Sequence, residues 1–340
     1  MKILYISDRQ DGGILRHVRC LRQCLPADVE SFEIGLGGDE EFAGRSGHDF
    51  RELWQIRRVI RVFKPDIVHL HCQPLMMLLY LKYFTSIPRI CSLHTPSRRK
   101  VAWDRHILNL TVQPCYFLAV SSKTWKRFLW NYPKAQGAVF YNPLRVGDAQ
   151  GCGWRSSMNA RNMIVGMLGR NADVKDWPSY IKLSAKMSVS ARNVSFWGIG
   201  ISKAEAIAKY GELANRIEWK GFQPNGREWI GKVDVFVLTS KEEEMPTVVL
   251  EAFAERTAIC GFIPEGGMSE ILSFSTGPLK EVFIKERDTS RLAEIVVSLL
   301  KDDVKRNAVI EDGWQILTNH FDAEKNCKGQ LMDIYRRMTK

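Results

Sequence analysis

The sequence predicts an α/β protein made of two doubly wound domains that face a central cleft. Short apolar runs typical of buried strands alternate with stretches of helical periodicity along the chain. The alternation stops at residues 147–161, which hold three glycines and two serines, and then resumes. A length of 340 residues suits two domains of about 150 to 170 residues each. We therefore expect a first domain over residues 1–150 and a second that starts at residue 151.

The first domain begins with a buried strand, residues 2–7, which a turn joins to an amphipathic helix. From Ile14 onwards one face of this helix is apolar and the other is rich in arginine. Gly12 and Gly13 let the backbone come close to a ligand where the helix starts. They lack the G-x-G-x-x-G spacing that follows the first strand of a dinucleotide dehydrogenase. A second helix is expected over residues 50–63.

The remaining strands of this domain are predicted where short apolar runs end next to polar residues. They cover residues 67–72, 89–93, 116–120 and 137–140. Such alternation favours a parallel sheet covered by helices, in which binding residues collect where the strands end. The polar residues at those ends are His71, His94, Ser121 and Asn142. His69 shares a strand face with His71, and this pair also suits a place in the core.

The second domain repeats the alternation. Its strands are predicted over residues 163–168, 194–197, 217–220, 233–238 and 258–262. Helices are predicted over residues 177–187, 203–210, near 229, from 246, and over 289–300, 304–318 and 323–338. The pattern again favours a parallel sheet with helices on both faces.

The stretch from Ser240 to Ala254 follows an apolar strand and opens a helix. Pro246 suits the first helical turn because its missing N–H would have no partner there. The free amides at this helix start would be those of Thr247, Val248 and Val249. Such a helix start attracts phosphate. Because Glu243 and Glu251 bracket it, the stretch offers amides for phosphate and carboxylates for hydroxyls, which suggests a sugar nucleotide as ligand.

The composition indicates a cytoplasmic protein. No stretch approaches the roughly 20 apolar residues of a membrane span, and the N-terminus is typical of a first strand rather than of a signal peptide. The eight cysteines include no C-x-x-C pair, so we expect reduced thiols. Residues 1–150 carry 22 Lys and Arg against 13 Asp and Glu, whereas the rest is nearly balanced. This basic half favours an anionic partner such as a membrane surface, an acidic glycan or nucleic acid, or is simply solvated.

Several short motifs recur in an order and spacing that resemble the retaining glycosyltransferases of glycosyltransferase family 4. They are Gly12-Gly13, the run PDIVHLH that ends at His71, Ser92-Leu93-His94-Thr95, Ala119-Val120-Ser121-Ser122, Tyr141-Asn142-Pro143, Gly166-Met167-Leu168-Gly169-Arg170 followed by Lys175, Gly198-Ile199-Gly200, Gly221-Phe222, and Glu243 to Glu251 followed by Gly266-Gly267 and Glu270. The resemblance covers almost the whole chain. It implies the GT-B architecture, with an acceptor domain over 1–150, a nucleotide-sugar donor domain over 151–320, and a helix, 321–340, that crosses back to the first domain.

The resemblance also implies a role for each motif residue. Arg170 and Lys175 would hold the donor diphosphate, because a guanidinium and an ammonium suit a phosphate leaving group. Glu251 would bind the ribose, Glu243 the transferred sugar, and His94 the sugar or the acceptor, unless it is a core histidine. The remaining residues of the predicted donor site are Gly12, Gly13, Gly198, Met245, Pro246, Thr247 and Val248. Such enzymes retain the anomeric configuration and need no metal ion or other cofactor.

Three residues depart from the motifs of the family. Glu244 and Met245 replace the usual glycine and phenylalanine after the first motif glutamate, and Asp176 replaces the glycine that commonly follows the motif lysine. These changes bear on the identity of the donor sugar. A nucleotide-sugar epimerase of the same fold and a non-catalytic nucleotide-sugar-binding protein remain alternatives. The sequence contains no recognised RNA-binding or DNA-binding motif that would support a nucleic-acid binder.

A cluster of basic and aromatic residues in the first domain suits an anionic membrane interface. It runs from Ser121 to Tyr132 and contains Trp125, Lys126 and Arg127. A second basic group would line the acceptor entrance and consists of Arg98, Arg99 and Lys100. These groups predict a glycan or lipid-linked glycan acceptor, such as an undecaprenyl-linked glycan or a lipopolysaccharide core, and peripheral attachment to the inner face of the cytoplasmic membrane. Packing of the aromatic residues in the core is the alternative.

Overall fold

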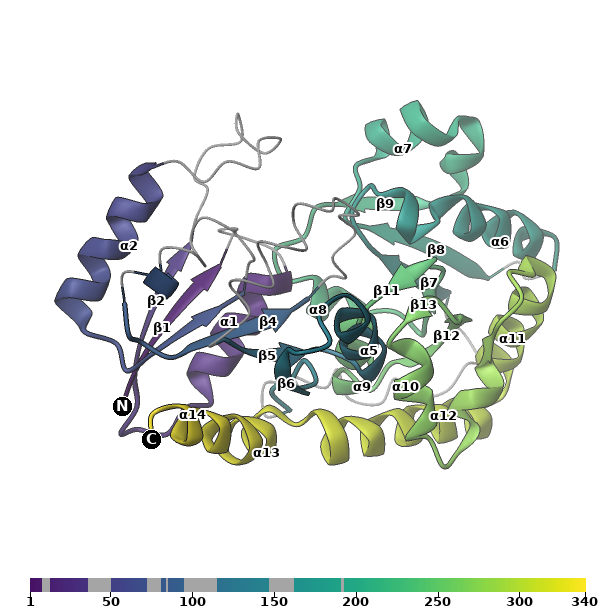
Figure 1. Ribbon diagram of the computed structural model, residues 1–340. Helices are drawn as coiled ribbons and strands as arrows, with labels where there is room; N and C mark the ends of the chain where they lie inside the picture. The colour runs from purple at the N-terminus through teal and green to yellow at the C-terminus, as the bar shows by residue number, and fades with distance from the viewer. Residues whose placement is uncertain are drawn as a thin grey trace. The chain divides into compact units, whose positions relative to one another are not determined.

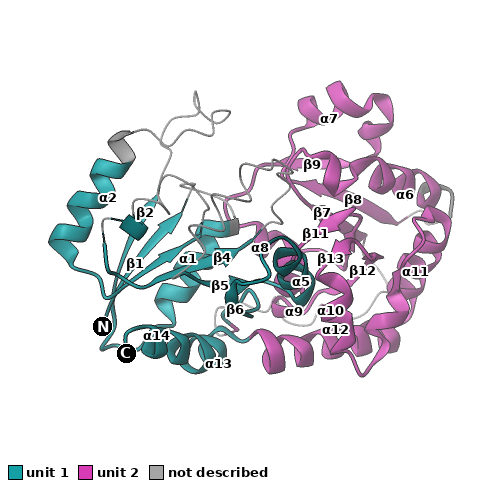
Figure 2. Cartoon of the chain, in the orientation of Figure 1, with its two compact units in different colours: residues 1–145, 322–340 teal, residues 146–321 magenta. Residues whose placement is uncertain are grey.

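The computed structural model (Figure 1) describes residues 1–7, 13–35, 50–71, 81–83, 85–94, 115–146, 162–190 and 193–340. The chain forms two compact units, coloured separately in Figure 2. Unit 1 comprises Met1–Arg145 and Asp322–Lys340, and unit 2 comprises Val146–Phe321. Both termini therefore belong to unit 1. Among the described helices, none is both long and apolar enough to cross a membrane.

Unit 1 is built on a parallel sheet of six strands in the order β2-β1-β3-β4-β5-β6. The strands are β1 (Lys2–Ser7), β2 (Glu30–Gly35), β3 (Ile67–Leu70), β4 (Arg89–Leu93), β5 (Cys115–Ala119) and β6 (Gln136–Val139). The strand order reverses between β1 and β3, because the chain first moves outward to β2 and then returns to the other side of β1. Strand β2 was not predicted from the sequence. It lies at the edge of the sheet and is half exposed, so it lacks a continuous apolar run.

Helices cover both faces of this sheet, and each face has its own apolar core. Side chains of β1 alternate between the two cores, with Ile3 and Tyr5 in one and Leu4 and Ile6 in the other. The first core includes α1 (Gly13–Gln23), α13 (Ala323–Asn326) and α14 (Met332–Met338), and the second includes α2 (Phe50–Phe63) and α5 (Ser122–Asn131). Ser121 caps α5 by accepting a hydrogen bond from the amide of Thr124 (3.1 Å).

The C-terminal segment is held to the rest of unit 1 by a backbone hydrogen bond and by a buried hydroxyl. Asp322 caps α13 by accepting from the amides of residues 324 and 325, and Ala323 N–H donates to the carbonyl of Leu144 (3.0 Å). The hydroxyl of Tyr335 lies 3.0 Å from the hydroxyl of Tyr5 in β1. The predicted single helix over residues 323–338 is interrupted by a π-helical turn over Cys327–Leu331, and a second π-helical turn covers Leu317–Phe321.

Unit 2 contains a second parallel sheet of six strands in the order β14-β12-β10-β7-β8-β9. Its strands are β7 (Met163–Leu168), β8 (Val194–Ile199), β9 (Glu218–Gly221), β10 (Val235–Leu238), β12 (Ala258–Phe262) and β14 (Phe283–Ile284). Here the strand order reverses between β7 and β10. A separate pair, β11 (Glu242–Glu243) with β13 (Glu265–Gly266), was not predicted, because two-residue strands leave no periodicity in the sequence.

The helices of unit 2 follow the strands in the predicted alternation, although α10 (Met268–Ser273) and strand β14 were not predicted. They are α6 (Trp177–Ser190), α7 (Lys203–Tyr210), α8 (Gly226–Ile230), α9 (Thr247–Ala254), α10, α11 (Thr289–Lys301) and α12 (Asp303–Ile316), with short 3-10 turns η2 (Asp173–Lys175), η3 (Glu212–Arg216) and η4 (Pro278–Val282). The predicted α/β class with two doubly wound parallel sheets is confirmed.

Candidate functional site

The reversal of strand order in unit 2 marks an edge of the sheet where ligands commonly bind. In doubly wound sheets the loops diverge at the carboxyl ends of the two strands that flank the reversal. These strands are β7, which leads into the turn 169–176, and β10, which leads into the loop 239–246 and α9. Two hydrogen bonds join the turn to the loop: Lys241 N–H donates to the carbonyl of Val174 (2.7 Å), and Thr239 Oγ1 donates to the carbonyl of Lys175 (2.9 Å).

An ion pair at this edge joins two residues that the sequence predicted for the donor site. Lys175 Nζ donates a short hydrogen bond to Glu243 Oε1. Each side chain is only 16% exposed, so solvent screens this pair less than it screens a surface pair. A phosphate that approaches the Lys175 ammonium would compete with the Glu243 carboxylate for it.

Helix α9 starts beside this ion pair. Pro246 is the N-cap of α9, one position before its predicted place. The amide of Val249 donates to the carbonyl of Pro246 (3.0 Å), so the prediction that this amide faces a ligand is wrong, because the first helical turn uses it. Thr247 and Val248 keep their place in the first turn of α9. Glu251, one turn further along, is buried and only 7% exposed.

A pair of glycines fixes the backbone of Glu243. Gly266 has a φ of +125°, and a Cβ built there would lie 1.8 Å from the carbonyl oxygen of Glu243. Only glycine adopts this conformation at so close an approach. Gly267 N–H donates to the same carbonyl (2.9 Å), and a Cβ at Gly267 would lie 2.3 Å from the carbonyl oxygen of Glu244. The predicted Gly266-Gly267 motif therefore has a local role, which is to support the Glu243–Glu244 loop.

Of the other predicted donor-site residues, Arg170 is exposed and Gly198 is buried. Arg170 is exposed after β7, and its carbonyl accepts a hydrogen bond from Trp177 Nε1 (3.2 Å). Gly198 is buried in β8, where a Cβ would lie 2.4 Å from the ring of Trp219. Close packing alone requires a glycine at this position, and its contact with a donor stays a prediction. Met245 is buried next to the start of α9.

Unit 1 gathers three histidines at the carboxyl ends of β3 and β4, beside the reversal of its own strand order. His71 Nδ1 and His94 Nε2 lie 3.0 Å apart and share one proton in a hydrogen bond. The ring of His17, from α1, lies 5.3 Å from that of His71 and 5.0 Å from that of His94. Burial lowers the pKa of His17 and His71 well below the usual value and that of His94 to about 4, so all three rings are neutral at pH 7.

His69 belongs to the core, as the sequence allowed. It is fully buried, and its two ring nitrogens lie 2.6 Å from the hydroxyl of Tyr335 and 2.9 Å from that of Ser92. Burial lowers the pKa of His69 to about 3. His17 was not predicted from the sequence. The available signal was its position on the helix that the Gly12-Gly13 motif opens.

Within the described part of the chain, His17, His71 and His94 are the one group of three or more side chains whose ligand atoms come close enough to hold a metal ion. Those atoms lie within 4.8 Å of one another. A tetrahedral zinc ion with Zn–N bonds of about 2.0–2.1 Å would require nitrogens separated by about 3.3 Å. In the structure His71 Nδ1 and His94 Nε2 are joined in a hydrogen bond, so these two rings form a neutral imidazole pair.

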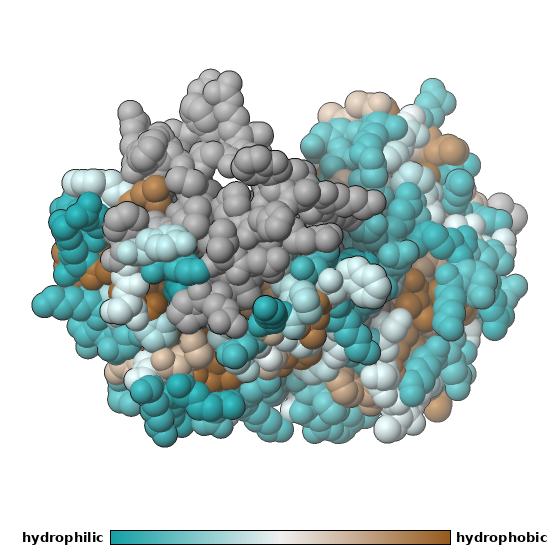
Figure 3. All heavy atoms as spheres, viewed as in Figure 1, coloured by the Kyte–Doolittle hydropathy of each residue, from teal (hydrophilic) through white to brown (hydrophobic). Residues whose placement is uncertain are grey.

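The other predicted residues of the first domain divide into three groups. Gly12, Arg98, Arg99 and Lys100 lie outside the described residues, whereas Gly13 begins α1. Trp125 packs on the core with its ring 6.0 Å from that of Phe128, which is the packing alternative of the sequence analysis. The side chains of Lys126, Arg127 and Trp130 are exposed, Trp130 by 89%. On the face that Figure 3 shows, hydrophilic residues cover most of the described surface.

Two sequence profiles match the chain, one in each unit. The profile described as Glycosyltransferase Family 4 matches residues 12–146, and the profile described as Glycosyl transferases group 1 matches residues 163–302. The chain belongs to glycosyltransferase family 4. Its two units, each with a parallel doubly wound sheet, are the two halves of the GT-B architecture in this family 4 protein.

Two relatives of this family 4 chain have names that refer to the biosynthesis of teichuronic acid and of a lipopolysaccharide core. The putative teichuronic acid biosynthesis glycosyltransferase TuaC of Bacillus subtilis (strain 168) is 34% identical over 115 residues, which are 34% of this chain and 28% of TuaC. The lipopolysaccharide core biosynthesis glycosyltransferase LpsE of Rhizobium meliloti (strain 1021) is 23% identical over 165 residues, or 47% of this chain and 46% of LpsE. The match thus spans less than half the length of either relative.

A solved structure with a similar fold supports the architecture of the family 4 chain. Anabaena HepE in complex with UDP superposes with a TM-score of 0.73 at 16% identity, covering 99% of this chain and all of HepE. At this level of identity the similarity concerns the fold.

Proposed function

We propose that the chain is a retaining glycosyltransferase that moves a sugar from a UDP-sugar or GDP-sugar to a glycan or lipid-linked glycan acceptor in cell-surface polysaccharide synthesis. The observation that carries this proposal is the meeting of Lys175, Glu243 and the start of α9 where β7 and β10 end. A cation and helix amides suit a diphosphate, and a carboxylate suits sugar hydroxyls. The names of TuaC and LpsE and the UDP bound to HepE agree with this chemistry.

In the proposed reaction, the protein stabilises the leaving diphosphate and positions the two substrates. Arg170, Lys175 and the amides of Thr247 and Val248 would neutralise the charge that develops as the bond between sugar and phosphate breaks. Glu251 would hold the ribose. Glu243 would hold the sugar near its reacting carbon, so that orientation contributes to the rate.

The acceptor hydroxyl would attack from the face that the diphosphate leaves, which retains the anomeric configuration. A departing phosphate oxygen would take the hydroxyl proton, so the reaction needs no separate base. Neutral His94, oriented by its hydrogen bond to His71, would contact the sugar or the acceptor. We also propose that no metal ion is required, because protein cations and amides would meet the phosphate charge. Full activity in excess EDTA is the expected result, and loss restored by Mg²⁺ would contradict this point.

A screen of nucleotide sugars by thermal shift tests the proposed function. A ligand at 100 times its dissociation constant adds about 2.7 kcal/mol of stability, which is enough to identify the base and the sugar. Lys175→Ala and Glu251→Gln should each weaken binding of the ligand found. Unchanged affinity in both variants would refute the site. Formation of an epimerised nucleotide sugar without an acceptor would instead favour the epimerase.

A membrane-linked acceptor is a separate part of the proposal. The exposed Lys126, Arg127 and Trp130 on α5 suit an anionic lipid surface. Sedimentation with vesicles that contain phosphatidylglycerol, but not with pure phosphatidylcholine vesicles, is the expected result. Equal sedimentation with both, or with neither, would contradict it.

A further inference from the structure

Asp176, the residue that replaces a family glycine, forms an ion pair behind the candidate donor site. It directly follows Lys175 and has a φ of +53°, in the left-handed region where glycine is favoured and Asp is tolerated. Its carboxylate is 8% exposed and accepts two hydrogen bonds, one from Ser179 Oγ (2.6 Å) and one from Arg287 Nη2. The side chain therefore points into the protein.

Arg287 connects this carboxylate to the end of β10. Its guanidinium donates through Nη1 to the carbonyl of Ser240 (3.1 Å) and through Nη2 to the carbonyl of Thr239, as well as to Asp176. Thr239 and Ser240 are buried, and their carbonyls lie beyond the last residue of β10. The planar fork of an arginine can serve three such acceptors at once, which an ammonium on a flexible stem does less well. The guanidinium also lies 4.6 Å above the ring of Phe262 in β12.

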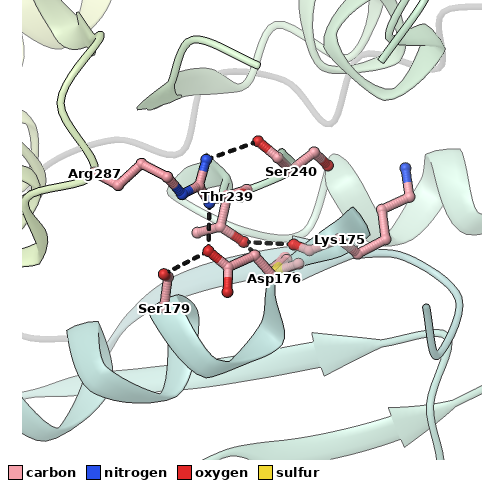
Figure 4. Close-up of polar contacts among 7 residues, drawn as sticks. Lys175, Asp176, Ser179, Thr239, Ser240 and Arg287 are labelled. Carbon is pink, nitrogen blue, oxygen red and sulfur yellow. Dashed lines mark hydrogen bonds and ion pairs between the residues drawn. The ribbon is translucent and has the colours of Figure 1, made fainter. Parts of the chain in front are cut away.

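Lys175 belongs to the same turn, residues 169–176, as Asp176, but its side chain extends in a different direction (Figure 4). In Figure 4 its side chain points away from Arg287, while its carbonyl accepts the hydrogen bond from Thr239. Arg287 thus contacts both segments that meet at the donor site, namely the turn that carries Lys175 and the loop that leads to Glu243. Among the described residues, no hydrogen bond or ion pair joins Arg287 to either of those two side chains.

We propose that Arg287 is a positioning residue, which acts through Asp176 to hold the Lys175 turn against the end of β10 and so fixes where the Lys175 ammonium meets the donor diphosphate. This inference rests on the proposed function. It explains why this chain has Asp176 where the family commonly has a glycine: the carboxylate helps Arg287 to support the phosphate site.

The affinities of UDP and uridine, with GDP and guanosine in parallel, test this inference. The ratio of the two affinities measures what the diphosphate contributes. Arg287→Ala should lower this ratio about tenfold, which corresponds to about 1.4 kcal/mol, and leave nucleoside affinity within about twofold. Asp176→Gly is the second variant. It removes the carboxylate at a backbone angle that glycine adopts without cost, so it should fold normally and lower the ratio by a smaller factor.

A double mutant separates positioning from a general loss of structure. In the background of Lys175→Ala, Arg287→Ala should have no further effect on the ratio, because the cation that it positions is gone. Arg291→Ala is the matched control, since Arg291 is an exposed arginine on α11 that pairs with Glu294 of the same helix. Its ratio should be unchanged.

Three results would overturn the inference. They are an unchanged ratio in folded Arg287→Ala and Asp176→Gly, an equal loss of nucleotide and nucleoside affinity, and an undiminished effect in the double mutant. A wild-type protein that binds no nucleotide would instead refute the proposed function and this inference with it.

Discussion

Glu243→Gln should strengthen the binding of free UDP or GDP while it weakens transfer. In the structure the Glu243 carboxylate already occupies the Lys175 ammonium. A phosphate bound on the other side of that ammonium would lie about 5 Å from the carboxylate, where two unit charges repel by about 3 kcal/mol at an effective dielectric constant of about 20. Screening at a partly exposed site reduces this to about 1–2 kcal/mol. The dissociation constant of the nucleotide should therefore fall roughly 5- to 30-fold.

Isothermal titration calorimetry with the nucleotide diphosphate measures this change directly. Glu242→Gln is the matched control, because Glu242 is the exposed neighbour on β11 and the exchange alters the net charge by the same amount. The gain should shrink as the salt concentration rises from 50 to 300 mM. Steady-state transfer with the donor identified by thermal shift should fall about 10- to 100-fold, since a hydrogen bond from a charged group to a sugar hydroxyl contributes about 1.5–3 kcal/mol. Equal affinities in the two variants, or weaker nucleotide binding in Glu243→Gln, would refute the reasoning.

Three further predictions concern the supports of the two units. Gly266→Ala should lower transfer at least about tenfold, because its Cβ would meet the carbonyl of Glu243 and displace the loop; kcat and KM measure this. Tyr335→Phe should destabilise unit 1 by about 2–4 kcal/mol in urea unfolding, since it leaves the buried hydroxyl of Tyr5 and a ring nitrogen of His69 without their partner. Unit 1 should also lose stability as the pH falls below about 6.5, because the pKa of His69 in the folded chain is about 3 and protons therefore favour the unfolded chain; hydrogen exchange at pH 7 and pH 5 measures this.

Each of these three predictions can be tested against a control variant or a stated result. Gly329→Ala is the control for Gly266→Ala, because a Cβ at Gly329 would meet nothing within 4 Å. Transfer that survives Gly266→Ala intact would contradict the role given to the loop. For Tyr335→Phe, a loss below about 0.5 kcal/mol would show that the buried network is not stabilising. For the pH effect, His69→Gln should reduce the acid loss in unit 1, and an unchanged loss would contradict the assignment to His69.

The sequence was sufficient to predict most of both sheets because their central strands are continuous apolar runs between turns. It was insufficient for β2, an edge strand with one exposed face, and for the two-residue strands β11, β13 and β14, which depend on contacts between distant residues. The C-terminal segment kept its helical periodicity, but nothing local indicated the π-helical turns at Leu317 and Cys327. Periodicity reports which face of a segment is buried, and it does not report the local hydrogen-bond register.

At the candidate site, residue types could be predicted but not their pairing. Lys175 and Glu243 are 68 residues apart, and they meet because the strand order reverses between β7 and β10. Arg287 is 111 residues from Asp176 and belongs to no motif, so no role could be predicted for it from the sequence. The same holds for His17, whose place beside His71 and His94 follows from the packing of α1 on the sheet. Long-range polar contacts of this kind leave no periodic signal in a single sequence.

Asp176 and Glu244, the two acidic residues that depart from the family pattern, differ in how they can affect the donor site. Asp176 points away from Lys175, and its carboxylate is engaged by Ser179 and Arg287, so it can influence a donor only through the backbone that it holds. Glu244 instead follows Glu243 on the loop that Gly266 and Gly267 support, and it is half-buried there. A residue next to the proposed sugar-binding carboxylate can alter the shape and charge of the sugar site directly. Any change in donor sugar relative to the family should therefore depend on Glu244, whereas Asp176 should affect diphosphate affinity for every sugar alike.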